Sequence, residues 1–128
     1  LAGGIGLGSA LEILHTLDMK KVQEYEHELL NYTTDKLLQI DGLKIYGTST
    51  NKTSAISFLI EGTHPYDVGV LLDKMGIAVR TGHHCTQPIM DFYQIPGTIR
   101  ASFSLYNTKE EVDVFIGALQ KIIPMLKN

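Results

Sequence analysis

The chain of 128 residues is long enough for one domain, and it contains 44% hydrophobic and 20% charged residues with a net charge of −3. This composition excludes a disordered chain, a collagen, a coiled-coil rod and a disulfide scaffold. The acidic balance, without a cluster of Lys or Arg, predicts no nucleic-acid partner.

Two helices are predicted to open the chain. Residues 1–17 are Gly-rich at first and then carry leucines at helical spacing. The glycines are not expected to bind a dinucleotide, because no strand precedes them and Ser9 stands where the third glycine would fall. We expect close helix packing there instead. Asp18 should cap a second helix over residues 19–40, whose apolar stripe comprises Val22, Tyr25, Leu29, Leu30, Thr33, Leu37 and Leu38.

The middle of the chain is predicted to alternate strands with one helix. Residues 43–46 form a short strand, and residues 54–61 form a core strand of alternating, mostly apolar character. Pro65 opens a helix at its first position, and Gly76 ends it. Residues 77–80 are predicted to be a third strand.

The C-terminal part is predicted to hold a long loop, a strand and a helix. The loop covers residues 81–97, and the strand covers residues 98–105 with alternate apolar side chains. Thr108 and Glu111 have the spacing of a capping box that begins the last helix. Pro124 is expected to disrupt the final turn of that helix.

These elements predict an α+β fold, a two-layer arrangement in which a small, mostly antiparallel sheet of about four strands is packed by helices. The expected order is α-α-β-β-α-β-β-α. Residues 1–128 contain no repeat, low-complexity segment or linker, so they are interpreted as a single domain. The chain begins at a leucine and has neither a secretory signal nor an apolar run of the ~20 residues that cross a bilayer. We therefore expect part of a larger cytoplasmic polypeptide with no membrane partner.

Candidate chemistry is concentrated around one thiol. Arg80 and Arg100 are the only two arginines, and they bracket the only cysteine, Cys85, and the adjacent pair His83 and His84. Both arginines are expected at strand ends beside the loop, facing one cleft. A guanidinium grips a carboxylate through two parallel hydrogen bonds. The pattern therefore predicts a site for a small ligand that bears a carboxylate, next to a reactive thiol.

Other interpretations of the same residues were weighed. A lone cysteine is most often a buried apolar residue, but the polar neighbours of Cys85 favour an exposed and reactive thiol. The ligand types for zinc are present, yet His15, His27 and Asp91 supply no ligand spacing, so no metal is predicted. A Cys–His hydrolase would want a third, orienting group, and none is obvious.

The sequence resembles the C-terminal part of cysteine desulfurases, in the SufS-like group of the class V aminotransferase family, which has the fold-type I architecture of pyridoxal-phosphate enzymes. The resemblance rests on Arg80-Thr-Gly-His-His-Cys85 with Gln87-Pro88, followed by Arg100-Ala-Ser-Phe-Ser-Leu-Tyr-Asn-Thr108. The Gly-rich opening, the segment Tyr25-Glu-His-Glu-Leu-Leu30 and the segment Gly42-Leu-Lys-Ile-Tyr-Gly47 are similar as well. The short loop after Arg80 is more similar to the SufS group than to the NifS/IscS group.

The resemblance implies an enzyme that takes sulfur from L-cysteine and leaves L-alanine, for iron–sulfur cluster assembly. Carried over by position, Cys85 is the thiol that holds the sulfur as a persulfide. Arg100 anchors the substrate carboxylate and Arg80 supports substrate placement. His83 and His84 match the motif as accessory residues without an assigned role.

The resemblance also implies what this chain lacks. Pyridoxal 5'-phosphate needs a Schiff-base lysine, and none of the nine lysines stands in the family's Ser-His-Lys context. We therefore expect the cofactor in the full-length enzyme and none bound to this chain, which alone should be inactive. The first helix, 1–17, would join the two domains. The implied partners are L-cysteine, with L-selenocysteine as an alternative substrate, a SufE- or SufU-like sulfur acceptor, and a second copy in a homodimer. The alternative function is a non-catalytic α+β module that binds a small carboxylate.

Overall fold

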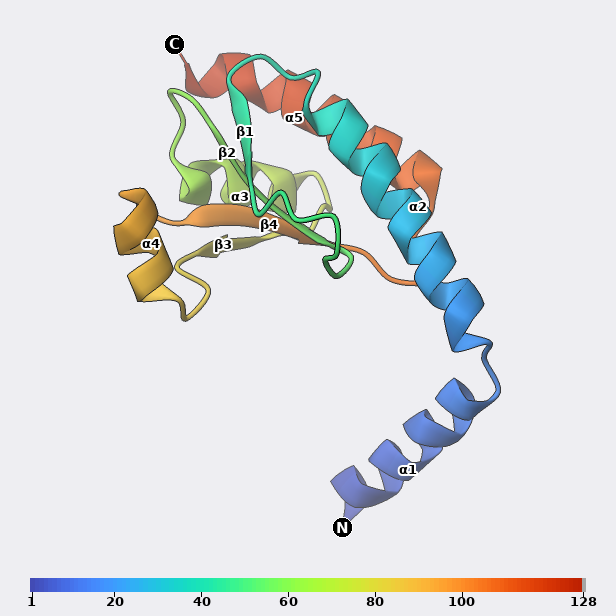
Figure 1. The fold of residues 1–128 in the computed structure, drawn as a ribbon. Helices are drawn as coiled ribbons and strands as arrows, with labels where there is room; N and C mark the ends of the chain where they lie inside the picture. The colour runs from blue at the N-terminus through green and yellow to red at the C-terminus, as the bar shows by residue number, and fades with distance from the viewer. Residues whose placement is uncertain (128) are drawn as a thin grey trace.

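The computed structural model describes residues 1–127, and within this range the chain forms five helices and four strands (Figure 1). In chain order the elements are α1 (Ala2–His15), α2 (Met19–Leu37), β1 (Leu43–Tyr46), β2 (Ala55–Ile60), α3 (Pro65–Lys74), β3 (Arg80–Gly82), α4 (Gln87–Tyr93), β4 (Thr98–Ser102) and α5 (Lys109–Leu126).

The strands form one sheet in the order β1-β2-β4-β3, and every neighbouring pair is antiparallel. The predicted α+β class with a small antiparallel sheet is confirmed. Strands β2 and β4 therefore lie at the centre of the sheet, and the short strands β1 and β3 form its edges.

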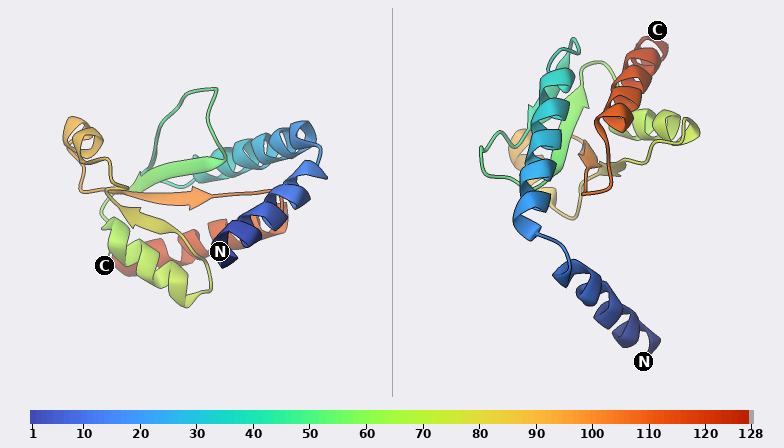
Figure 2. Two further views of the ribbon diagram at one scale, coloured as in Figure 1. Left: turned by 90° about the horizontal axis from the view of Figure 1, so that it is seen from below. Right: turned by 90° about the vertical axis from the view of Figure 1, so that its right-hand side faces the viewer.

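One face of the sheet is covered by helices and holds the core. Along β2 the buried residues alternate as Ile56, Phe58 and Ile60, because successive side chains of a strand point to opposite faces. Figure 2 shows α3 and α5 on this side, while α4 and the 47–54 loop lie on the other. Seven residues of α5 are buried at helical spacing, so the amphipathic last helix supplies much of the core.

The predicted helix caps are confirmed. The Asp18 side chain accepts hydrogen bonds from the amides of Lys20 and Lys21, which starts α2. At α5, Thr108 and Glu111 satisfy one another's backbone amides as a capping box.

Two details of the helices differ from the prediction. Leu38 follows the end of α2 and is 60% exposed, so it does not belong to the buried stripe. Pro124 does not disrupt the last turn, because α5 continues to Leu126 and the Lys127 amide still bonds the Ile123 carbonyl. A proline near a helix end removes one backbone donor, and the hydrogen bonds around it here continue the helix.

The segment between α3 and β4 differs most from the prediction. The third strand lies at Arg80–Gly82 rather than at 77–80, and the predicted loop 81–97 contains the helix α4. Two exposed apolar residues, Ile89 and Phe92, hide any amphipathic pattern in α4, and no side chain caps its start. The strands predicted over 54–61 and 98–105 are also shorter, at Ala55–Ile60 and Thr98–Ser102.

Helix α1 forms as predicted but has no buried residue (Figure 1). Its leucines Leu7, Leu11 and Leu14 are 62%, 47% and 43% exposed. A Cβ added at any of its four glycines would meet no atom within 4 Å, so the close packing expected there is not made with residues 1–127. Across the same range, no helix combines the length and the apolar character that crossing a membrane requires.

Candidate active site

A row of four side chains crosses the sheet on the face that α3 and α5 leave open. Tyr46 pairs with Ser57, Ser57 with Arg100, and Arg100 with Arg80, so each of the four strands contributes one residue. Directly opposite residues of antiparallel strands present their side chains on one face. The row therefore brings both arginines together, as the sequence predicted, and adds Tyr46 and Ser57 to them.

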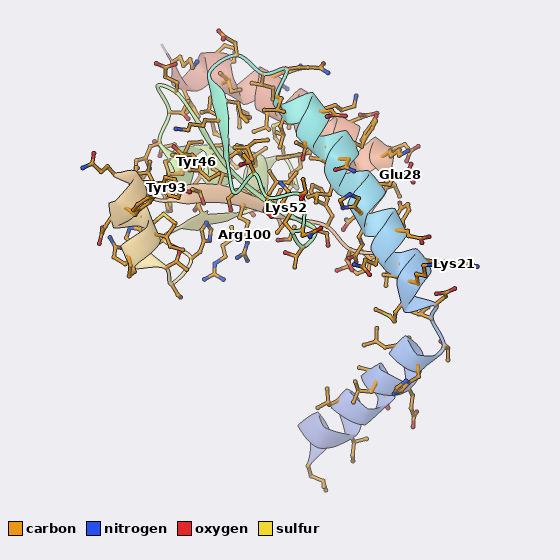
Figure 3. The ribbon with its side chains drawn as sticks, in the orientation of Figure 1. Lys21, Glu28, Tyr46, Lys52, Tyr93 and Arg100 are labelled. Carbon is orange, nitrogen blue, oxygen red and sulfur yellow. The ribbon has the colours of Figure 1, made fainter. Side chains whose placement is uncertain are left out.

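Arg100 lies in the middle of β4, so the expectation that both arginines stand at strand ends holds only for Arg80. Its neighbours Ile99 and Ala101 are buried in the core, as the alternation of a strand requires. Figure 3 shows the Arg100 side chain projecting from the sheet, well away from α5.

Neither arginine is neutralised within residues 1–127, where every ion pair uses a lysine. Glu111, which follows Arg100 by eleven positions in the sequence, accepts hydrogen bonds from the Asn107 side chain and the Thr108 amide. The Nε atom of Arg100 is buried without a hydrogen-bond partner. A buried, unpartnered guanidinium nitrogen is costly unless a ligand completes it, and an anion supplies the best acceptor. The arrangement therefore fits a carboxylate ligand.

The thiol lies beside this row. Cys85 is exposed, in the turn between β3 and α4, and an Nη atom of Arg80 donates to its Sγ at 3.9 Å. This placement agrees with the predicted exposed position outside the regular elements. The contact places the sulfur directly beside the guanidinium of one of the two arginines in the row.

The two histidines differ in their surroundings. His83 is exposed, and its carbonyl accepts hydrogen bonds from the amide and the hydroxyl of Thr86. His84 folds back over β4, with Nε2 at 3.2 Å from the Thr98 carbonyl oxygen and 2.9 Å from the Thr98 Oγ1. Burial lowers the pKa of His84 below its ordinary value, and the charges of both arginines act in the same direction, against the hydrogen bond to Thr98. His84 is therefore held neutral.

The segment from Gly82 to Gly97, which carries the thiol, is held by one contact at its base and another further along. Gly82 and Gly97 meet backbone to backbone with φ of 112° and 136°, and a Cβ on Gly97 would lie 2.8 Å from the Gly82 carbonyl carbon. Further along, Tyr93 of α4 packs edge-on against Tyr46 at 5.3 Å between ring centroids (Figure 3). The thiol turn is thus attached to the sheet on both sides.

Pyridoxal phosphate needs a lysine amine for its Schiff base. Among the described residues, Lys36 and Lys109 are held by Asp113 and Glu28, and Lys52 donates to the Gly47 carbonyl. Over residues 1–127 there is also no group of three acidic, histidine or cysteine side chains that could hold a metal ion. The site therefore combines two arginines that can bind a carboxylate with an adjacent thiol.

Sequence reasoning missed Tyr46, Ser57 and Thr98. The first two reach the row only through strand pairing, which depends on register and therefore on the whole sheet. Thr98 could have been found, because it stands two residues before Arg100 and alternation places both on one face of β4.

Comparison with known proteins places these features in a family. The class-V aminotransferase family model matches residues 1–115. The chain is 42% identical to a probable cysteine desulfurase of Xylella fastidiosa and 45% identical to a cysteine desulfurase of Serratia proteamaculans, in both cases over 98% of this chain and 30% of the relative.

Solved structures agree. The cysteine desulfurase of Thermococcus onnurineus in its apo form superposes with a TM-score of 0.90 at 36% identity, over 97% of this chain and 31% of that chain. The cysteine desulfurase CsdA of Escherichia coli, in an S-sulfonic acid form, gives 0.91 at 34% identity, over 98% and 31%. The chain thus spans about 30% of the length of the curated relatives it matches. With its fold and its sequence in agreement, the chain belongs to the class-V aminotransferase family.

Proposed function

We propose that this chain is the C-terminal part of a SufS-like cysteine desulfurase, which converts L-cysteine to L-alanine and holds the sulfur as a persulfide on Cys85. The observation that carries the proposal is the register pair of Arg80 and Arg100 with the Cys85 sulfur 3.9 Å from Arg80. The names of the relatives favour it over the alternative, a non-catalytic module for a small carboxylate.

In this proposal the two arginines orient the substrate. Arg100 binds the carboxylate of L-cysteine through its planar fork, and its unpartnered Nε gains an acceptor. Arg80 lies next to Arg100 in the row and donates to the Cys85 sulfur, so it keeps the attacking sulfur close to the bound carboxylate. Holding the two reacting sulfur atoms in one geometry makes the transfer effectively intramolecular, which is a large source of rate acceleration.

The transfer balances without an external oxidant or reductant. The Cys85 thiolate attacks the sulfur of L-cysteine, a sulfur–sulfur bond forms, and the carbon–sulfur bond breaks. The electron pair of the broken bond stays with the carbon skeleton, which takes up a proton and leaves as L-alanine. Pyridoxal phosphate supplies an electron sink in enzymes of this family, and its lysine would stand outside this chain.

The finer expectations belong to the same proposal. The first helix, residues 1–17, would connect this domain to the one that holds the cofactor. A SufE- or SufU-like protein would accept the sulfur for iron–sulfur cluster assembly, in a cytoplasmic homodimer. The chain alone would neither bind the cofactor in a lysine adduct nor turn over L-cysteine.

The test is the substitution Cys85→Ser in the enzyme that contains this chain, with the matched variant Thr86→Ser as control. We expect Cys85→Ser to abolish protein-bound persulfide, measured by mass spectrometry, while the visible absorption of the cofactor remains. Thr86→Ser should retain both. A Cys85→Ser enzyme that still forms persulfide at the wild-type rate would overturn the proposal.

A further inference from the structure

The thiol is carried by a turn of unusual composition. The Thr86 amide donates to the His83 carbonyl at 2.9 Å, which closes a four-residue turn from His83 to Thr86. Its central residues, His84 and Cys85, have φ of 54° and 62°. Two positive φ values at the centre are the pattern of a type I′ turn, which strongly prefers Asn, Asp or Gly. Histidine tolerates a positive φ better than most residues but cysteine does not, so the geometry at Cys85 must be imposed by other contacts.

The contact that imposes it is made by the His84 ring. Nε2 of His84 lies near both the carbonyl and the hydroxyl of Thr98, and the tautomer with its proton on Nε2 is the one that donates to the carbonyl. Nδ1 is buried without a partner, which favours this tautomer, because an unpaired buried N–H is less tolerable than an unpaired acceptor. Thr98 itself is 2% exposed and pairs with Gly82 at the end of the ladder between β3 and β4. The His84 side chain thus extends the attachment of the two strands beyond their last backbone pair.

We propose that His84 is a positioning residue: its hydrogen bond to Thr98 holds the strained turn in the conformation that points the Cys85 sulfur at Arg80. The first central residue of the turn is anchored, and the second central residue carries the thiol. The neutral imidazole is sufficient as the anchor, because burial and the charges of both arginines disfavour a second proton on the ring. The catalytic consequence, a slower attack on the substrate sulfur without His84, rests on the proposed function; the positioning of the thiol does not.

The test uses the charge preference of thiol alkylation in the full chain. Iodoacetate and iodoacetamide react by the same chemistry, so the ratio of their rates reports the positive charge near the sulfur and cancels changes in general exposure. We expect His84→Ala to lower this ratio by roughly five-fold, the effect of one unit charge at ~4 Å in a water-like dielectric. His84→Gln, whose amide can still donate to the Thr98 carbonyl, should keep most of the ratio. The exposed neighbour gives the matched control, and His83→Ala should leave the ratio unchanged.

A double-mutant cycle distinguishes positioning from a direct effect. If His84 acts by holding the sulfur beside Arg80, then His84→Ala in an Arg80→Ala background should change the ratio no further. Additive losses in the double mutant, or an unchanged ratio in His84→Ala, would overturn the proposal. Circular dichroism establishes that each variant is folded. If His84→Ala does not fold, His84→Gly replaces it, since glycine adopts a positive φ without strain. If neither variant folds, His84 is required for fold stability and the proposal is overturned as well.

The same variants separate this inference from the proposed function. The alkylation ratio does not depend on turnover, so a confirmed cycle in a protein without desulfurase activity would reject the function alone. In an active enzyme, His84→Ala should slow persulfide formation on Cys85 while the KM for L-cysteine stays near the wild-type value. An enzyme in which only KM rises would instead place His84 in substrate binding and reject the positioning role.

Discussion

The two faces of the sheet are built from the same strands but serve different ends. On β4, Ile99 and Ala101 are buried in the core beneath the helices, while Arg100 between them points to the open face. On β2, buried Phe58 and half-buried Ser57 are divided in the same way.

The difference shows that residues on each face of a strand are constrained, but by different requirements. The covered face is fixed by burial and shape, because each of its side chains packs among many others. The open face carries the two arginines that the ion pairs of residues 1–127 leave unneutralised. Of these two, Arg100 has a buried Nε without a partner, which costs stability in the absence of a ligand. Substitutions at adjacent positions should therefore separate stability from function.

The sharpest contrast is expected between Phe58 and Ser57. Phe58 is fully buried and packs against Phe115 at 6.2 Å between ring centroids, so Phe58→Ala should lower the free energy of unfolding by ~3–5 kcal/mol. Ser57→Ala, one residue away on the open face, should change it by less than ~0.5 kcal/mol. Urea denaturation followed by circular dichroism measures both. Equal losses would mean that the two faces do not differ in their share of the core.

On the open face, Arg100→Ala should impair activity more than stability. Loss of a hydrogen bond to a charged group lowers kcat/KM for L-cysteine by the equivalent of ~1.5–3 kcal/mol, and by more if substrate orientation also fails. Arg100→Lys should recover only part of this, because an ammonium group has no planar fork. Steady-state kinetics of the full enzyme give both values. Wild-type kinetics for Arg100→Ala would remove this residue from the site.

The close backbone approach of Gly82 and Gly97 can be tested by substituting Gly97. A Cβ there would collide with the Gly82 backbone at a φ that other residues rarely adopt, so Gly97→Ala should cost roughly 1–3 kcal/mol of stability. Gly117 provides the matched control: it lies inside α5 with open space around it, and alanine there should stabilise the helix by up to ~1 kcal/mol. Thermal unfolding of the two variants should shift in opposite directions, and a shift in the same direction would contradict the close backbone approach.

The smallest effect is a pH dependence that belongs to the open face. The folded pKa of His84 is lowered below 6.5 by burial, with further lowering from Arg100, Arg80 and His83, so the unfolded chain binds more protons than the folded one as pH falls below 6.5. Stability from this group is complete above pH 6.5 and is lost as pH falls through the lowered value. The pKa values of Glu111 and Asp113 are lowered below their ordinary values of 4.5 and 3.8. These two groups therefore affect the stability only in more acidic solution. His84→Gln should therefore flatten the stability profile just below pH 6.5, and an unchanged profile would contradict a neutral, half-buried His84.

The elements that the sequence predicted well are those whose signals are local. Asp18, Thr108 and Glu111 cap their helices through residues two or three positions away, and Pro65 and Gly76 bound α3 for equally local reasons. The core side of β4 also follows from strand alternation alone. For the same reason, the cluster around Cys85 was visible as a run of chemically active residues.

What the sequence could not supply depends on contacts between distant segments. Helix α4 exposes apolar residues, and it is joined to β1 by the contact of Tyr93 with Tyr46. Its sequence therefore shows no amphipathic pattern of helical period. The direct opposition of Arg80 and Arg100 is a property of register, which is decided by the whole sheet. The positive φ of Cys85 and the bond from His84 to Thr98 likewise arise from tertiary structure that overrides local preference.

The contact between Gly82 and Gly97 closes the base of the thiol segment, so the chain leaves the sheet and returns to it at almost the same place. Residues between the glycines that make neither the His84–Thr98 bond nor the Tyr93–Tyr46 contact can therefore be added or removed while β3 and β4 keep their register. Each doubling of such a loop costs only about 0.6 kcal/mol of closure entropy. The reach of the thiol is therefore a property that evolution or an engineer can tune by length, while the arginine row stays where the sheet has placed it.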